Sequence, residues 1–189
     1  MGALTRSKLF WPAMTLVVLL GVNAAVRPSF LSLRMQDGHL YGSLIDILRN
    51  GAPTLLVALG MTLVIATRGI DLSVGAIVAI AGAISCMFIY DSPEPGAVST
   101  VLIAVVLAIA VCLVFGVWNG FLVSVLGIQP IIATLILMTA GRGIAMLITN
   151  GQIITITSAP YKMIGAGYWA TLPVAILIAG AMFAGTAAL

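Results

Sequence analysis

Few side chains in this sequence are suited to acid–base or nucleophilic chemistry, and they are scattered. His39 is the only histidine, so no H-E-x-x-H zinc motif exists, and a serine triad would need that one ring to meet both an acid and a serine. Asp71 and Asp91 flank apolar runs but lack the glycine-flanked second motif of an intramembrane aspartyl pair. The only lysines are Lys8 and Lys162, and no phosphate-binding G-x-x-x-x-G-K-[ST] loop occurs. We expect no enzyme activity and no cofactor, so any ATP hydrolysis must reside on another chain.

The composition indicates a membrane protein. Of the 189 residues, 62% are hydrophobic and 7% are charged, whereas soluble domains usually carry about 25% charged residues. The formal net charge of +3 comes from scattered basic residues, which reflects topology and makes nucleic acid an unlikely partner. A bilayer core takes roughly 20 apolar residues per spanning helix, which limits the chain to about five or six crossings. We predict an all-α polytopic membrane protein of about six transmembrane helices, with residues 1–189 forming one transmembrane domain.

The first apolar run, residues 9–26, sets the predicted orientation. It is longer than the usual signal-peptide core of about 7–15 residues and lacks a small-residue cleavage pattern, which favours a membrane anchor. Arg6 and Lys8 precede it and place the N-terminus in the cytoplasm. The polar stretch 27–51 then emerges on the outer side, although its arginines run against the positive-inside bias.

Residues 43–51 are expected to form a short interfacial helix. Ser43 and Asp46 suit its first turn, and Asn50-Gly51 can end it. The remaining crossings come from apolar runs at residues 52–67, 74–90, 100–128, 131–148 and 170–189. The acidic, proline-containing loop 91–99 is typical of the outer side. The run 100–128 is longer than one crossing needs, so we expect it to tilt, bend or pack closely at residues 116–120, where Gly116 and Gly120 have the G-x-x-x-G spacing that lets two helix backbones approach.

Arg142 is the charge that falls within an apolar run. Near the helix centre it would cost about 2.5–3.5 kcal/mol against lipid, so it should face protein or water. Thr134, Met138 and Arg142 recur at i, i+4 and i+8 on one helix face. One interpretation is a hydrophilic pathway lined by this face, with Asn119 and Gln129 contributing hydrogen bonds.

The alternative for Arg142 is structural. It would neutralise carbonyl groups freed by Gly141 and Gly143, or pair with Asp71 to lock two helices. The turn before residue 74 is open to two interpretations as well. In the first, Arg68 and Asp71 form a local ion pair at the cytoplasmic interface, and Asp71 or Ser73 caps the next helix. In the second, the turn lies at membrane depth and is a broken helix of the type found in transporters.

Several sequence blocks resemble the ribose-type sugar permeases of the ABC importers. The signature blocks are residues 60–67 (GMTLVIAT) and 69–75 (GIDLSVG). Two further blocks agree in order and spacing, WNG with LV at 118–123 and IQP through ATL to RG at 128–143. The stretch from MQDG at residue 35 to Gly75 is similar to the galactofuranose branch.

The resemblance implies a membrane-spanning subunit of a bacterial inner-membrane importer for a monosaccharide such as galactofuranose or ribose. Two permease copies would pair with a cytoplasmic ATP-binding subunit and a periplasmic sugar-binding protein, and ATP on the partner would drive alternating access. Most sugar selectivity would lie in the binding protein, so no deep sugar site is expected. The residues expected to line or gate the pathway are Asp71, Ser73, Asn119, Gln129, Thr134 and Arg142.

Two departures from the family pattern are visible. Arg68 stands where the motif generally has glycine, which stiffens the turn and adds a charge. Family members are also longer, and their segment that docks on the ATPase lies beyond this sequence. The chain is therefore expected to be the N-terminal portion of a permease, or a truncated product that serves only assembly or does not transport. An ion-coupled secondary transporter is a further alternative, but it would usually need more intramembrane acids than Asp71 alone.

Overall fold

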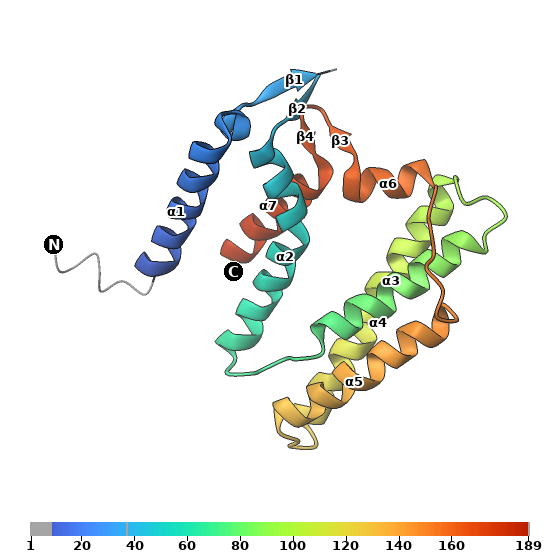
Figure 1. Cartoon of the computed structure of the whole chain (residues 1–189). Coiled ribbons are helices and arrows are strands. Elements are labelled where there is room, and N and C mark those ends of the chain that lie inside the picture. Colours follow the sequence, from blue (N-terminus) through green and yellow to red (C-terminus); the bar gives the residue numbers. More distant parts are fainter. Residues whose placement is uncertain (1–8, 37, 189) are drawn as a thin grey trace.

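Helices dominate the computed structural model, which describes residues 9–36 and 38–188 (Figure 1). The helices are α1 (Phe10–Val26), the short 3-10 helix η1 (Pro28–Leu31), α2 (Ser43–Ala66), α3 (Val74–Tyr90), α4 (Val98–Ser124), α5 (Pro130–Ile148), α6 (Ala159–Ala166) and α7 (Val174–Ala187). The prediction of an all-α protein is confirmed. Two small antiparallel hairpins were not predicted, β1 (Arg34–Gln36) with β2 (His39–Tyr41) and β3 (Tyr168–Trp169) with β4 (Leu172–Pro173).

The lengths of the apolar helices suit a bilayer. Among the described residues, α2, α4 and α5 have 24, 27 and 19 residues and are long and apolar enough to cross a membrane. The helices α1, α3 and α7 are also apolar but shorter, with 17, 17 and 14 residues. At 1.5 Å per residue, a 17-residue helix spans about 26 Å, close to the roughly 30 Å hydrocarbon core. These six helices agree with the predicted number of crossings.

The predicted interfacial helix over residues 43–51 is wrong. The chain runs as one continuous helix, α2, from Ser43 to Ala66, so Asn50-Gly51 does not end it. Glycine ends a helix when it adopts a positive φ, and Gly51 keeps a negative one. Pro53 then lies inside the helix, where its missing N–H interrupts the backbone ladder. A full break here would leave more backbone groups unpaired in an apolar environment, which favours the continuous helix.

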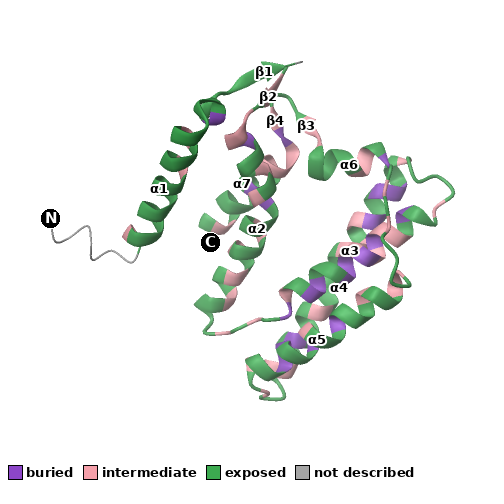
Figure 2. Ribbon diagram, viewed as in Figure 1, coloured by how far each residue is buried: buried purple, intermediate pink, exposed green. Residues whose placement is uncertain are grey.

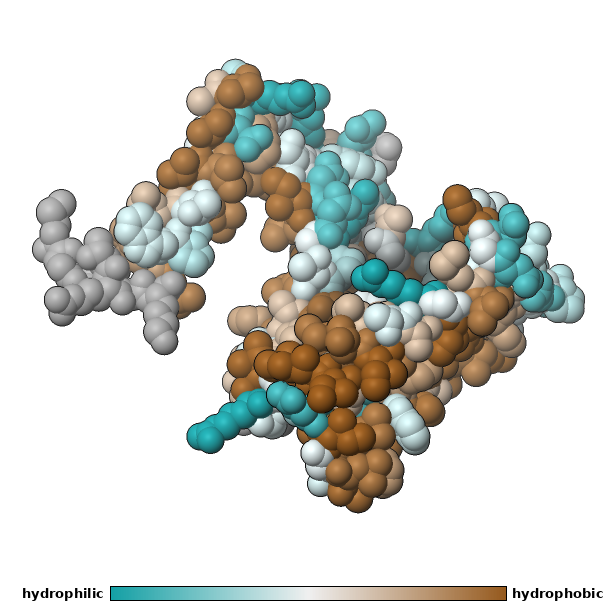
Figure 3. Space-filling view, turned by 60° about the horizontal axis from the view of Figure 1, so that its bottom comes forward, coloured by the Kyte–Doolittle hydropathy of each residue, from teal (hydrophilic) through white to brown (hydrophobic). Residues whose placement is uncertain are grey.

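The helices pack in two groups, seen side by side in Figure 1. One group places α3 against both α4 and α5, and the other places α2 against α7. Figure 2 shows buried residues concentrated along α3 and on the facing sides of α4 and α5, whereas α1 is exposed along most of its length. Large apolar side chains remain on the surface, and Figure 3 shows broad hydrophobic areas over the face turned to the viewer. Such surface is stable only against lipid or other protein.

Helices α3 and α5 approach each other closely at Gly141. A Cβ atom added there would lie 2.9 Å from the Cβ of Ala76 and 3.2 Å from Cδ1 of Ile80, so α3 and α5 meet where one residue has no side chain. Gly116 and Gly120 meet nothing within 4 Å, so no close approach occurs at that spacing within the described residues. Helix α4 continues through both glycines, and the predicted tilt or bend there stays a prediction.

The two hairpins join one end of α2 to one end of α7. The N–H of Leu40 donates to the carbonyl of Thr171 at 3.0 Å, and Nδ1 of His39 lies 2.9 Å from the carbonyl oxygen of Ala170. The Tyr168 ring lies beside two rings of the first hairpin, with its centroid 4.8 Å from that of His39 and 5.3 Å from that of Tyr41. These contacts fix the hairpins to each other at the end opposite the turn between α2 and α3 (Figure 1).

Candidate functional site

Three of the predicted residues meet where the chain passes from α2 to α3. Asp71 Oδ1 accepts two hydrogen bonds from Ser73, one from the backbone N–H at 2.7 Å and one from the hydroxyl at 2.6 Å. Asn119, on α4, donates from Nδ2 to Oγ of Ser73 at 2.9 Å. A hydroxyl that donates to a carboxylate can still accept from an amide, so the three contacts are mutually consistent. They form one polar chain that ties α4 to the start of α3.

This polar chain is buried. Ser73 is 0% exposed and Asn119 is 7% exposed, whereas Asp71 is half-buried. The hydrogen bond from Asn119 to Ser73 helps to hold α4 against the start of α3. Oδ1 of Asn119 is buried and has no hydrogen-bond partner among the described residues, so the site keeps one acceptor for a hydroxyl or a water.

The predicted side-chain cap of α3 is wrong in its details. Ser73 occupies the N-cap position, but its side chain makes no capping bond to the helix. Its backbone is in the right-handed helical region (φ −84°, ψ −11°) instead of the extended conformation usual for a capping residue. Asp71 also makes no bond to the first turn of α3, because its Oδ1 binds Ser73.

The turn lies within the length of the helix bundle. Ala76, in the first turn of α3, meets Gly141 on α5. Along the axis of α5, Gly141 lies about 16 Å from Pro130, the first residue of the helix, at a rise of 1.5 Å per residue. Helix α4 likewise continues past Asn119 to Ser124. Both neighbouring helices therefore extend beyond the break, which favours the broken-helix interpretation over a turn at the end of the bundle.

The other predicted residues lie apart from this cluster. Thr134 is buried, but its hydroxyl donates to the carbonyl of Pro130 within α5 at 2.8 Å. Gln129 is exposed at the N-cap of α5. Arg142 is exposed and forms no salt bridge with any residue that the structure describes. Adjacent residues on a helix point about 100° apart, so Arg142 turns away from the face through which Gly141 contacts α3.

The two ion pairs considered for Asp71 do not form in residues 9–36 and 38–188, because neither Arg68 nor Arg142 makes a salt bridge there. Arg68 instead adopts φ +61°, a left-handed conformation that costs an ordinary side chain about 1–2 kcal/mol. Glycine has no such cost. A glycine at this position, which the resemblance to the family motif implies, would adopt the same backbone conformation without that cost.

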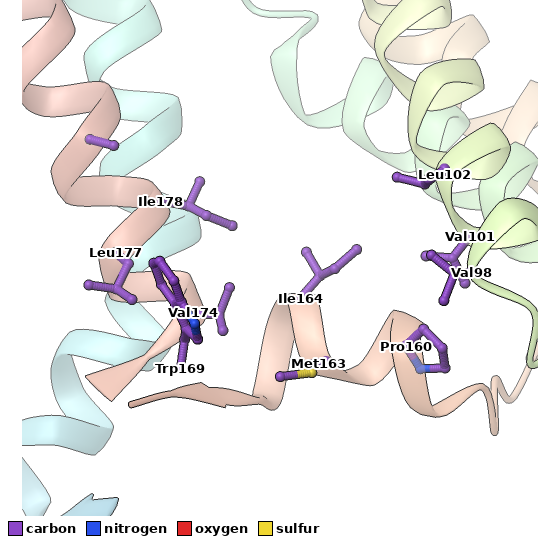
Figure 4. A pocket seen from close by; sticks show the side chains of 11 residues that line it. Val98, Val101, Leu102, Pro160, Met163, Ile164, Trp169, Val174, Leu177 and Ile178 are labelled. Atoms are coloured by element: carbon purple, nitrogen blue, oxygen red, sulfur yellow. The ribbon is translucent and has the colours of Figure 1, made fainter. Parts of the chain in front are cut away.

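Two cavities lie away from these residues. An apolar one of about 600 Å³ lies between α4, α6 and α7, and Figure 4 shows its lining side chains, among them Leu102, Ile164 and Ile178. No lining residue is charged, so this cavity is unsuited to a polar substrate. A polar one of about 410 Å³ lies between η1, the first hairpin and the start of α2. The residues that line this cavity were not predicted as a site, although the many polar residues in the stretch 27–51 are a signal for one.

The sequence and this architecture agree with a known permease family. A family model described as "Branched-chain amino acid transport system / permease component" matches residues 43–166. The chain belongs to this permease family. The match includes α2 to α6 and therefore the whole polar chain from Asp71 to Asn119. Membership and the apolar helices make the chain an inner-membrane permease component and not a catalytic enzyme.

Similar curated proteins are sugar permeases, as the sequence blocks predicted. The permease is 47% identical over 89% of its length to the galactofuranose transporter permease protein YtfT of Escherichia coli (strain K12), covering 49% of that protein. It is 38% identical over 93% of its length to the fructose import permease protein FruF of Bifidobacterium longum (strain NCC 2705), covering 49%. It is 35% identical over 86% of its length to the ribose import permease protein RbsC of Bacillus subtilis (strain 168), covering 47%. The chain spans about half the length of these relatives. No solved structure matches it significantly.

Proposed function

We propose that this chain is the membrane-spanning part of a permease subunit of an ATP-binding-cassette importer that moves a monosaccharide, galactofuranose, ribose or a similar sugar, across the bacterial inner membrane. The observation that carries the proposal is the 47% identity to a galactofuranose transporter permease over 89% of the chain. The matches to a fructose and a ribose import permease support the wider substrate class. Residues 1–189 act as one transmembrane domain, with the N-terminus in the cytoplasm.

The partners follow from this function. A separate cytoplasmic subunit hydrolyses ATP, a periplasmic protein delivers the sugar, and a second permease copy completes the passage. The large apolar surface that remains on the isolated chain supports burial against lipid and against other subunits.

The polar residues divide into two roles in this proposal. Asp71, Ser73 and Asn119 gate transport by holding the break between α2 and α3. They do not line the pathway, because the full burial of Ser73 keeps its hydroxyl from a passing sugar. Gln129 and Arg142 are exposed and available to line the pathway. Thr134 is buried and supports the first turn of α5 by its bond to the carbonyl of Pro130.

Sugar uptake by the native permease in its own membranes tests the proposal. Radiolabelled galactofuranose, ribose and fructose are supplied to vesicles that contain the binding protein, and uptake is compared after ATP depletion and after addition of an uncoupler. Uptake should stop with ATP loss and survive the uncoupler. Uptake that survives ATP loss and stops with the ion gradient would identify an ion-coupled transporter instead.

A further inference from the structure

The polar cavity beside the first hairpin has the character of a small-molecule site. Its volume of about 410 Å³ lies in the range of roughly 300–1,000 Å³ typical of ligand pockets. Unlike most such pockets it is lined by polar side chains, with Arg34 and Gln36 on β1, Tyr41 on β2, Asp46 on α2 and three serines. A ligand with few hydrogen-bonding groups would leave these side chains without partners.

The charges in the cavity balance. Arg34 and Asp46 are the charged residues of its described lining, and neither forms a salt bridge within residues 9–36 and 38–188. A free guanidinium offers only donors and a free carboxylate offers only acceptors, whereas Gln36 offers both. The combination suits a neutral molecule that carries several hydroxyl groups, because each hydroxyl can donate and accept. A charged ligand would leave either Arg34 or Asp46 facing a like charge.

The walls of the cavity are held by the fold. Gly42 lets the end of the hairpin approach the loop after η1, since a Cβ atom there would lie 2.7 Å from the carbonyl oxygen of Ser32. The hairpin is also held by the bonds of His39 and Leu40 to the β3–β4 turn. Tyr41 is 39% exposed, which leaves part of its ring for the non-polar face of a sugar.

We propose that this cavity is a subsite for a neutral monosaccharide at the outer mouth of the permease. The subsite rests on the proposed function and on its cytoplasmic N-terminus, which puts the hairpin on the outer side. It receives the sugar before the sugar enters the pathway. The permease would thus contribute to sugar recognition in addition to its binding protein.

Direct binding of sugars to the purified full-length permease, in detergent and without the binding protein, tests this subsite. The probes are D-ribose, D-fructose and a methyl galactofuranoside, with D-glucuronate as a charged sugar, and saturation-transfer NMR reports weak binding. The test variants are Asp46→Asn and Gln36→Ala. Their controls are Glu94→Gln and Gln152→Ala, which change an exposed acid and an exposed glutamine outside the cavity.

The neutral sugars should bind, and both test variants should raise their Kd about tenfold while the controls leave it unchanged. Asp46→Asn should also strengthen glucuronate binding, because it leaves Arg34 without a balancing charge. A purely structural role of Asp46 would not produce this reversal. Binding is compared only for variants whose thermal stability equals that of the wild type. Gln36→Ala, an exposed strand residue, provides the test if Asp46→Asn does not fold.

Three results would overturn the subsite. The first is no sugar binding by the wild type, and the second is equal Kd values in test and control variants. The third is unchanged sugar binding with a transport defect that excess binding protein corrects, which would identify a docking surface for that protein. ATP-dependent uptake is measured on the same preparations. Uptake without cavity binding rejects the subsite alone, whereas the absence of ATP-dependent uptake rejects the proposed function with it.

Discussion

Gly141→Ala should destabilise the permease, although alanine is the better helix former. The new methyl group would lie 2.9 Å from the Cβ of Ala76, whereas non-bonded carbon atoms are most stable at about 3.5–4.0 Å. Ala76 has no flexible side chain that could move aside, so the α3 and α5 backbones must separate. Gly143→Ala is the matched control, because a Cβ atom there meets nothing within 4 Å on the same helix.

The magnitude follows from two opposing effects. Overpacking a close contact typically costs about 1–3 kcal/mol. Replacing glycine by alanine inside a helix gains about 0.5–1 kcal/mol. Gly141→Ala should therefore lower the stability by up to about 2.5 kcal/mol, whereas Gly143→Ala should raise it by up to about 1 kcal/mol. The difference between the two variants, about 1–3 kcal/mol, isolates the steric term because the helix-propensity gain cancels.

Thermal unfolding of both variants in the same detergent measures this difference. The double variant Gly141→Ala with Ala76→Gly moves the methyl group from one helix to the other and should recover most of the loss. Equal stability of Gly141→Ala and Gly143→Ala would refute the close approach of α3 and α5. A double variant that is no more stable than Gly141→Ala would also refute it, because relief of the contact would then have no effect.

Further predictions concern the turn and the exposed arginine. The losses of unfolding free energy caused by Ser73→Ala and Asn119→Ala should be non-additive, with a coupling energy of about 0.5–1.5 kcal/mol in the double variant. Additive losses would mean that the hydrogen bond between the two side chains contributes nothing. Arg68→Gly should keep or raise the thermal stability by up to about 1 kcal/mol, whereas Arg68→Val should lower it because of the positive φ; a loss with glycine would contradict this. Arg142→Gln should reduce sugar uptake and leave the yield of folded protein near that of the wild type, since Arg142 is exposed and has no salt bridge in the described chain. A lost yield would indicate a structural role.

The sequence predicted individual helices well where an apolar run has clear ends. Residues 74–90 form α3 as expected, and the run from residue 131 to 148 differs from α5 by one residue. In a bilayer every backbone group must be paired within the segment, so a long apolar run leaves little choice but a helix. The same rule explains the error at residues 43–51, where local stop signals at Asn50-Gly51 were outweighed by continuation into the next apolar run.

The candidate site was predicted in its residue types but not in its grouping. The motif drew attention to Asp71, Ser73 and Asn119, and the structure joins them by hydrogen bonds across 46 residues of sequence from Ser73 to Asn119. Nothing local distinguishes these residues from Gln129 or Arg142, which are also polar residues near apolar runs. Which of them meet depends on how α3, α4 and α5 pack.

The sequence by itself determined that this protein is a helical membrane permease and where most of its helices lie, because composition and apolar length act locally on each segment. Only the tertiary structure decided that the close approach lies at Gly141, between α5 and α3. Gly116 on α4 has no neighbour within 4 Å among the described residues. It also decided that the two distant hairpins share one end of the molecule. Lipid is as apolar as the helix surfaces, so apolar character does not select which faces meet. Close packing of small residues and buried hydrogen bonds make that choice, and both require the three-dimensional arrangement.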